Sequence, residues 1–377
     1  MGGWPADRTG VNLALQMRVL ITGGAGFVGA SLGISLAARH PDWELVAYDN
    51  LHRRGSELNL PRLEAAGIGF VAGDVRNPEA LMEIDRIDAL VECSAEPSAL
   101  AGTDGETAYT VHTNLTGAYN CLELARRDGA QLVFLSTSRV YPIRSQSELS
   151  CDEGPTRFEL SDGQALPGAS SAGISEEFPL EGARTLYGAT KLAAELLIEE
   201  YADGFGLQTV IDRCGVITGP WQMGKVDQGV FAFWLFHHHF GLPLSYIGYG
   251  GTGKQVRDLL HVDDLVELVD EQLSDPEGWA GFVGNVGGGR DNSLSLLETT
   301  AICRELTGVE VPIESVPETR PGDVPIFLAD CARLFQRTDW RPSRDPGETL
   351  TDIHRWTVAN ESSLAEALGL DAAARVS

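Results

Sequence analysis

The sequence predicts an α/β protein with a doubly wound parallel sheet and a smaller C-terminal lobe. In the first half of the chain, apolar runs of strand length alternate with helical patterns, as in β-α-β units. A glycine-rich turn follows the first of these runs, and from about residue 214 the regular alternation stops. The length of 377 residues suits one large domain or two lobes with a sizeable buried core.

Each expected element is defined by its pattern and its boundary residues. The apolar runs predict strands at residues 18–21, 44–48, 69–72, 89–93, 132–135 and 209–213. Helical spacing predicts helices near residues 28–39, 78–84, 107–127 and 187–203, the last of which we expect Gly204 to end. The polar segment 144–184 has no convincing period, and we expect a long loop or insertion there.

Composition excludes several classes of function. Asp and Glu total 54 against 28 Lys and Arg, and the net charge of −26 repels nucleic acid at long range. There is no apolar run of roughly 18 residues, so we expect no membrane span. The six cysteines lack a CxxC pair and the first residues lack a signal peptide, which favours a cytoplasmic protein. No metal is expected, because adjacent histidines at 237–239 point in different directions on a helix.

The glycine-rich turn has the features of a dinucleotide site. Thr22 to Gly29 reads TGGAGFVG between a strand and a helix, where a pyrophosphate can lie on the helix N-terminus. Asp49 follows at the end of the second strand and can accept hydrogen bonds from ribose hydroxyls, which favours NAD over NADP. Arg53 and Arg54 nearby weaken that preference. The candidate cofactor residues are Gly23, Gly26, Phe27, Val28, Asp49, Asn50, Arg53, Asp74, Val75, Asn114, Tyr187 and Lys191.

Two residues on one helix face are candidates for proton transfer. Tyr187 and Lys191 stand four residues apart, and a nearby ammonium stabilises a phenolate that can act as a base. Thr137, at the end of the fifth strand, can reach the same sugar oxygen, or it is an ordinary hydroxyl at a strand end. Asn114 is either a polar relay or a helix-packing amide.

The TGGAGFVG turn, Asp49, the STSRVY segment and the YGATK run resemble the extended short-chain dehydrogenase/reductase family of NAD-dependent nucleotide-sugar epimerases and dehydratases. The resemblance covers roughly residues 17–360. It implies a Rossmann-like fold, bound NAD that is used and regenerated in each cycle, and catalysis by Thr137, Tyr187 and Lys191. By the same resemblance, the candidate substrate residues are Thr137, Trp221, Gln222, Arg257, Arg320 and Asp323, of which the two arginines would grip a nucleotide diphosphate.

The resemblance also implies a division of the chain and a partner. Independently of the resemblance, residues 1–16 are expected to be a disordered extension or to follow an upstream start site, since Met17 stands directly before the first strand. Residues 17–213, with return segments around 255–290, would be the NAD-binding domain. Residues 214–254 and 291–365 would form the substrate-binding lobe, whose ligand is a nucleotide-diphosphate sugar. A homodimer is expected through the helices near 107–127 and 187–203.

Several segments narrow the reaction that the resemblance implies. Ser138 and Arg139 follow Thr137 where dehydratases carry Asp-Glu, and Arg139 stands where decarboxylases carry Glu, so both reactions are disfavoured. The segments YDNLHRRG, VDQGVFAFW, GKQVRD and NSLSLLE are most similar to the CDP-paratose (CDP-tyvelose) 2-epimerases. That similarity implies inversion at carbon 2 of a CDP-hexose through a keto sugar.

Departures from the family pattern keep alternatives open. Pro142 and Leu186 replace a usual Gly and Pro, and the segment Glu92 to Ser98, ECSAEPS, replaces an HxAG-type wall beside the nicotinamide. A UDP-hexose 4-epimerase is the alternative within the class. A non-catalytic NAD-binding regulator is the alternative outside it.

Overall fold

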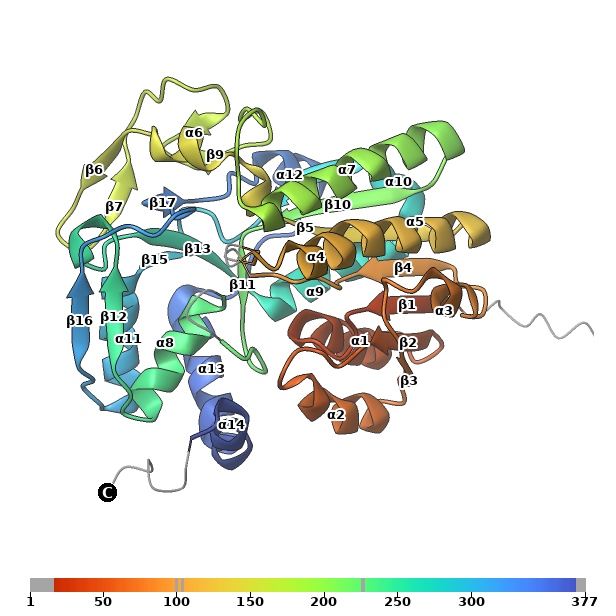
Figure 1. Cartoon of the computed structure of the whole chain (residues 1–377), viewed down its shortest axis with the longest axis horizontal. Coiled ribbons are helices and arrows are strands. Elements are labelled where there is room, and N and C mark those ends of the chain that lie inside the picture. The colour runs from red at the N-terminus through yellow and green to blue at the C-terminus, as the bar shows by residue number, and fades with distance from the viewer. Residues whose placement is uncertain (1–16, 99–100, 103–104, 225–227, 371–377) are drawn as a thin grey trace, which may run out of the picture.

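A seven-stranded parallel sheet forms the centre of the computed structural model, which describes residues 17–98, 101–102, 105–224 and 228–370 (Figure 1). The strand order is β14-β10-β5-β4-β1-β2-β3, and each neighbouring pair is parallel. The predicted fold class is confirmed, whereas the extension expected at 1–16 lies outside the described residues. The strands are β1 (Arg18–Thr22), β2 (Glu44–Asp49), β3 (Gly69–Ala72), β4 (Ala89–Glu92), β5 (Gln131–Thr137), β10 (Thr209–Cys214) and β14 (Phe282–Val286).

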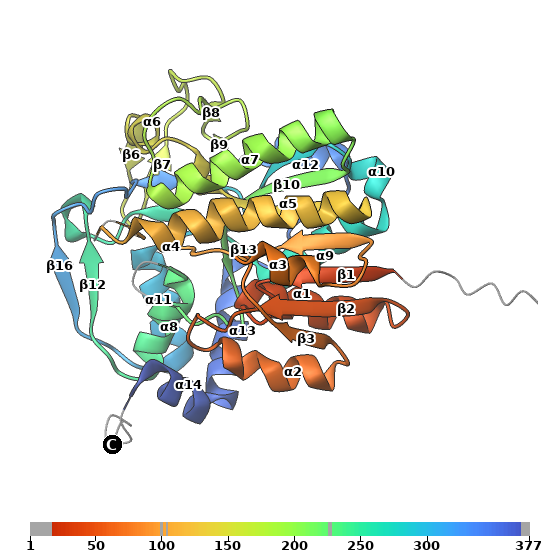
Figure 2. The ribbon, with the colours of Figure 1, turned by 45° about the vertical axis from the view of Figure 1, so that its right-hand side comes forward.

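Helices cover both faces of this sheet (Figure 2). On one face, the strands share an apolar core with five helices: α1 (Phe27–Arg39), α2 (Leu60–Ala65), α9 (Val262–Ser274), α10 (Pro276–Trp279) and α12 (Ala332–Arg337). The opposite face packs against α3 (Pro78–Met82), α5 (Gly117–Asp128) and α7 (Leu186–Phe205). The buried strands are largely apolar because both of their faces are covered, and among the exceptions are the buried side chains of Glu92, Asp212 and Arg213.

Two helices differ from the sequence prediction. The helix expected near 107–127 consists of α4 (Thr107–Val111), a π-helical turn (His112–Thr116) and α5. Helix α7 begins at Thr185, whose hydroxyl accepts a hydrogen bond from the Gly188 amide. It does not end at Gly204 as predicted, because Gly206 supplies the left-handed residue, with a φ of 68°, that closes the helix.

The segment 144–184 is more ordered than the loop that the sequence predicts. It contains most of α6 (Ile143–Ser147) and two short antiparallel pairs, β6 (Cys151–Glu153) with β7 (Phe158–Leu160) and β8 (Ala169–Ser170) with β9 (Gly173–Ile174). Strands of two or three residues have too few positions to show an alternating pattern, so the sequence gives little sign of them.

The C-terminal part of the chain builds a further apolar core, separate from those on the two faces of the sheet. It contains a four-stranded sheet of β11 (Val216–Thr218), β13 (Val256–His261), β15 (Ser293–Ser295) and β17 (Ile326–Phe327), and the pair β12 (Leu244–Ile247) and β16 (Ile313–Val316). Its helices are α8 (Val230–His239), α11 (Leu296–Thr307), α13 (Pro346–Ala359) and α14 (Glu361–Leu368). Three short 3-10 turns are η1 (Ser56–Asn59), η3 (Ser138–Val140) and η4 (Tyr249–Gly251).

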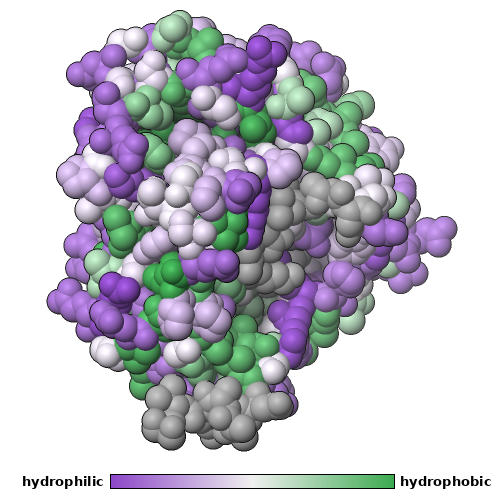
Figure 3. Space-filling view, turned by 60° about the vertical axis from the view of Figure 1, so that its left-hand side comes forward, coloured by the Kyte–Doolittle hydropathy of each residue, from purple (hydrophilic) through white to green (hydrophobic). Residues whose placement is uncertain are grey.

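The exposed surface mixes polar and apolar residues. One face, shown in Figure 3, has hydrophilic and hydrophobic residues interspersed, as expected for an acidic solvated surface. Within the described residues, no helix combines the length and the hydrophobicity needed to cross a bilayer.

A buried ion pair fixes α7 against the sheet. The Arg213 guanidinium on β10 donates to the Glu195 carboxylate, with 2.8 Å between Nη2 and Oε2, and both side chains are buried. Ser136 on β5 also donates to Glu195, and Arg213 donates to the Tyr141 hydroxyl. This network anchors α7 one turn beyond Lys191, so it sets the position of the helix that carries two candidate catalytic residues.

We predict that Arg213→Met lowers the free energy of unfolding by about 3–5 kcal/mol, because it leaves the Glu195 carboxylate buried without its counter-ion. Equilibrium urea unfolding measures the change. Arg213→Met with Glu195→Met removes both charges and should recover most of the loss. Equal instability of the single and double variants would contradict the electrostatic explanation.

Candidate active site

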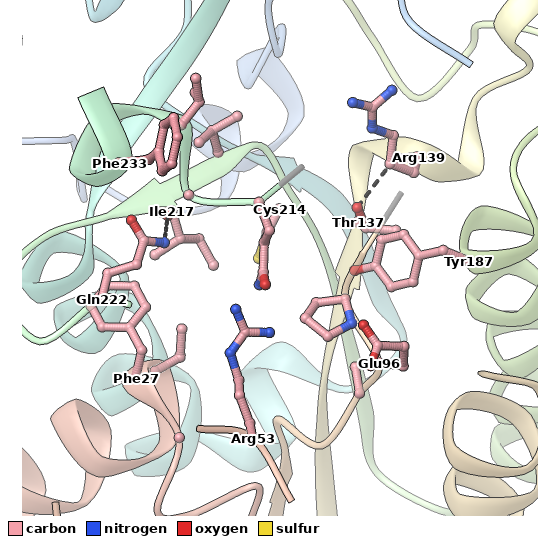
Figure 4. Close-up of a pocket in the computed structure, with 18 of the residues that line it drawn as sticks. Phe27, Arg53, Glu96, Thr137, Arg139, Tyr187, Cys214, Ile217, Gln222 and Phe233 are labelled. Atoms are coloured by element: carbon pink, nitrogen blue, oxygen red, sulfur yellow. Dashed lines mark hydrogen bonds between the residues drawn. The ribbon is translucent and has the colours of Figure 1, made fainter. Parts of the chain in front are cut away.

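A cavity of about 900 Å³ lies where the carboxyl ends of the central strands meet the C-terminal part of the chain (Figure 4). Its lining brings together most of the candidate residues from the sequence: Gly23, Gly26, Phe27, Val28, Asp49, Asn50, Arg53, Val75, Thr137, Tyr187, Gln222, Arg257, Arg320 and Asp323. Of the described candidates, Asp74, Asn114, Lys191 and Trp221 lie outside that lining. Parallel strands with their carboxyl ends at one edge make this the expected position for a ligand.

The glycine turn has the shape needed to hold a pyrophosphate. A Cβ on Gly23, whose φ is 64°, would lie 2.9 Å from the Cys93 backbone, and one on Gly29 would lie 2.3 Å from the Gly23 carbonyl oxygen. Helix α1 begins at this turn with no side-chain cap and no acidic residue in its first turn. Its first amides are therefore available to an anion in the cavity, which fits the phosphates of a dinucleotide.

Asp49 joins the end of β2 to the glycine turn. Its Oδ2 accepts from the Ala25 amide at 3.1 Å and its Oδ1 from the Leu51 amide at 2.8 Å. Burial raises the pKa of the Asp49 carboxyl, and the backbone hydrogen bonds oppose that rise. The carboxylate lines the cavity at the position predicted for ribose recognition.

Two of the candidate cofactor residues bind protein groups. Asp74 forms an ion pair with Arg76 and accepts from the Asn50 side chain, and these hydrogen bonds hold its pKa well below the usual range. The Asn114 amide group bonds both the N–H and the C=O of Glu96, at 2.7 and 3.1 Å. Asn114 therefore holds the cavity wall in shape in this structure.

Thr137 and Tyr187 meet at the centre of the lining, as Figure 4 shows. Thr137 ends β5 and its hydroxyl accepts from the Arg139 amide at 3.2 Å. Tyr187 lies in the first turn of α7, which is pressed against η3: a Cβ on Gly188 would lie 2.0 Å from the Arg139 carbonyl oxygen. Only glycine permits so close an approach, and the approach brings the phenol to the strand end.

Near neutral pH the phenol of Tyr187 stays protonated in this structure. Burial raises the pKa of Tyr187 to about 12, and the hydrogen bond with Thr137 and the charge of Arg139 oppose the rise. A base at neutral pH therefore needs added positive charge in the cavity.

Lys191 lies one turn beyond Tyr187 but is buried beneath the lining. Its Nζ is 3.5 Å from Oε2 of Glu92, and both side chains are 2% exposed. Sequence reasoning noted Glu92 as a departure from the family pattern but did not predict this ion pair.

The far end of the cavity carries positive charge. Arg257 on β13 binds Asp323 at 2.6 Å and the Val324 carbonyl oxygen at 2.8 Å, which ties β13 to the segment that carries Arg320. Arg139 donates to the Gly322 carbonyl oxygen of the same segment at 3.0 Å. Three guanidinium groups thus gather around the segment 320–323, in a protein of net charge −26.

The side chains of Gln222 and Trp221 have different surroundings in the structure. Gln222 lines the cavity and is held by the Ile217 carbonyl oxygen and the Thr218 hydroxyl. Trp221 packs instead under the Arg62 guanidinium, 3.9 Å from its ring centroid, and against Trp356.

Sequence reasoning missed the contribution of α8 to the site. Phe233 and His237 line the cavity from one face of this helix, with ring centroids 4.0 Å apart. Their spacing of four residues places them together, but α8 is apolar on all sides, so no stripe marks the exposed face.

The fold and this cavity define a dinucleotide-dependent enzyme of the Rossmann type. A profile of the NAD dependent epimerase/dehydratase family matches residues 19–287, and the chain belongs to this family. It is an NAD-dependent enzyme of the nucleotide-sugar epimerases and dehydratases.

Relatives cover nearly the whole chain. A CDP-paratose 2-epimerase from Salmonella typhi is 28% identical over 90% of this chain and 99% of its own. A dTDP-glucose 4,6-dehydratase from Mycobacterium tuberculosis is 28% identical over 92% and 95%. The solved Thermus thermophilus UDP-glucose 4-epimerase in complex with NAD is 26% identical, with a TM-score of 0.72 over 90% of this chain and 98% of that one.

We predict that Gly26→Ala lowers the NAD content of the purified protein about tenfold, which corresponds to roughly 1.4 kcal/mol of binding free energy. The backbone of Gly26 is extended, with φ −71° and ψ 174°, so alanine fits the chain. Its methyl group would stand 3.0 Å from the Gly23 carbonyl oxygen, at the wall of the cavity. Absorbance and mass spectrometry of released NAD measure the content.

The control is Gly204→Ala, because a Cβ there meets no described heavy atom within 4 Å. It should keep the parent's NAD content. Full NAD content in Gly26→Ala would contradict the assignment of the glycine turn to the pyrophosphate.

Proposed function

We propose that this protein inverts carbon 2 of a CDP-hexose through a transient keto sugar. The observation that carries the proposal is the position of Tyr187 and Thr137 in one cavity, between the glycine turn and the arginines of the segment around 320–323. Similarity to a CDP-paratose 2-epimerase over 90% of the chain supports the choice of carbon and nucleotide.

The residues of the chain have separate tasks in this reaction. NAD, when bound, would supply the hydride acceptor for carbon 2 and a positive charge in the cavity. The glycine turn and Asp49 would hold the dinucleotide, and Lys191 carries its ammonium on the same helix as Tyr187, paired with Glu92. The Tyr187 phenolate takes the proton of the carbon-2 hydroxyl and later returns it, and the Thr137 hydroxyl fixes the same oxygen by a hydrogen bond.

The arginine end of the cavity suits the diphosphate of the substrate. Arg257 and Arg320 line this end of the cavity and are candidates for bidentate contacts with phosphate oxygens. We assign the substrate-binding lobe to residues 214–254 and 291–365, which include Arg320, and Arg257 faces this lobe from the neighbouring segment 255–290.

The residues after Thr137 argue against dehydration. Elimination of water needs an acid and a base beside the sugar, whereas Ser138 and Arg139 follow Thr137 here. A UDP-hexose 4-epimerase uses the same central residues, so the choice between the two epimerases rests on assay.

We predict that the purified protein interconverts CDP-hexoses that differ at carbon 2, with no net redox change, and that Tyr187→Phe lowers kcat by at least about 100-fold. Nuclear magnetic resonance of the product identifies the inverted carbon. Tyr201→Phe, a change of the same kind on the outer part of α7, is the control and should keep parental turnover.

Two other assay results would contradict the proposed reaction. Inversion at carbon 4 of UDP-glucose with no CDP-hexose turnover would replace it by the 4-epimerase. Unchanged turnover in Tyr187→Phe would contradict the role of the phenol.

We further propose a cytoplasmic homodimer that pairs the helices near 107–127 and 187–203. The large apolar residues Tyr119, Leu196 and Phe205 on α5 and α7 are exposed by 44, 58 and 62%. A contact between copies would cover them. We expect light scattering to give a dimer that Leu196→Glu with Phe205→Glu converts to a monomer, and a monomeric parent protein would contradict this.

A further inference from the structure

A buried ion pair lies directly beneath the floor of the cavity. The Lys191 ammonium is 3.5 Å from Oε2 of Glu92 and 3.8 Å from the ring centroid of Phe134. The catalytic task proposed for Lys191 needs its positive charge, but here that charge faces a carboxylate rather than the open cavity. A carboxylate so placed changes the field that the lysine exerts on its neighbours.

Local structure holds Glu92 in this position. Glu92 is the last residue of β4 and stands in register with Thr22 on β1 and Phe134 on β5, so all three side chains point to the face that α7 covers. The Ser94 hydroxyl donates to Oε1, and Lys191 lies beside Oε2. Each carboxylate oxygen therefore has a partner, and the side chain is fixed although it is charged and buried.

Charged groups from several elements surround the Tyr187 phenol. Arg139 on η3 lowers the pKa of Tyr187, whereas Glu92 on β4 raises it. The thiols of Cys93, Cys121 and Cys214, on or after β4, α5 and β10, have pKa values raised by burial, so they are neutral near pH 7. Arg139 and Glu92 therefore act on the phenol with opposite signs, Lys191 lies one helical turn away beside Glu92, and the Glu96 carboxylate lines the same cavity as Tyr187 (Figure 4).

We propose that Glu92 is a positioning residue: it holds the Lys191 ammonium beneath the cavity floor and offsets its charge at Tyr187. The proposal rests on the function proposed above, in which Tyr187 is the base. The two charges of the ion pair largely cancel at the phenol, so the positive charge that favours ionisation of Tyr187 would come from Arg139 and from NAD when it is bound. The base is thereby weak until NAD is bound.

The direction in which each substitution shifts the pKa of Tyr187 follows from the charges that remain. Glu92→Gln leaves the ammonium unopposed, stabilises the phenolate and should lower the pKa of Tyr187 by about one unit. Lys191→Met leaves the carboxylate unopposed and should raise that pKa. The double variant removes both charges and should return the pKa close to that of the parent.

Ultraviolet absorbance of tyrosinate in the NAD-loaded protein measures this directly. Each background is compared with the same background carrying Tyr187→Phe, over the pH range in which circular dichroism shows a folded protein. At a fixed pH below the midpoint, Glu92→Gln should contain about tenfold more Tyr187 phenolate than the parent, since one pKa unit is a factor of ten. The acidic limb of the kcat/KM profile should move to lower pH by the same amount.

Asp212→Asn is the matched control. It removes another buried carboxylate of the same sheet, on β10, whose partner is Gln272 of α9 on the opposite face. It should leave the pKa of Tyr187 unchanged.

An unchanged or raised pKa of Tyr187 in folded Glu92→Gln would overturn the proposal. If that variant does not fold, equal pKa values in Lys191→Met and the double variant would overturn it instead. The titration needs no substrate, so a shifted pKa without CDP-hexose turnover would reject the proposed function and leave the role of Glu92 intact.

Discussion

The contact between the first turn of α7 and the end of β5 sets the geometry on which the whole site depends. Gly188 lets the helix backbone reach the Arg139 carbonyl, and this places the Tyr187 phenol beside the Thr137 hydroxyl. The ion pair of Glu195 with Arg213 then holds the helix against β10, one turn beyond Lys191. The glycine, phenol and ammonium belong to one stretch of α7, Tyr187 to Lys191, whereas the hydroxyl of Thr137 comes from β5, about 50 residues earlier, and backbone packing brings the two elements together.

Local charge explains how a protein of net charge −26 can hold two phosphate-bearing ligands. The surface acids act through water and salt, which screen them over about 10 Å. Within the cavity, the amides at the start of α1 and the guanidinium groups of Arg139, Arg257 and Arg320 act at contact distance. The Arg257 side chain is also held by Asp323, so its orientation is fixed in advance.

Much of the fold could be predicted because its signals are local in the sequence. The alternation of strands and helices predicts six strands of the central sheet, and the glycine turn and Asp49, which the sequence singles out, both line the cavity. The seventh strand, β14, was not evident because only its pairing with β10 places it in the sheet, and the cavity residues of α8 were not evident because only tertiary contacts bring them to the site.

Side-chain direction was less predictable than position. The spacing of Tyr187 and Lys191 correctly gives one helix face, yet the partner of Lys191 is decided by Glu92, which is 99 residues distant in sequence. Trp221 and Gln222 are neighbours, but a positive φ of 72° at Trp221 sends its ring toward Arg62 instead of the cavity. Such outcomes depend on packing, which no local pattern reveals.

The central claim is that carbon 2 of a CDP-hexose is oxidised and reduced again within this one cavity. The most direct test uses a CDP-hexose carrying deuterium at carbon 2, incubated with the NAD-loaded protein in ordinary water. Mass spectrometry should show that the epimerised product keeps its deuterium at carbon 2, because the hydride that leaves is the one that returns. Loss of the deuterium to water, at a rate matching epimerisation, would contradict this account.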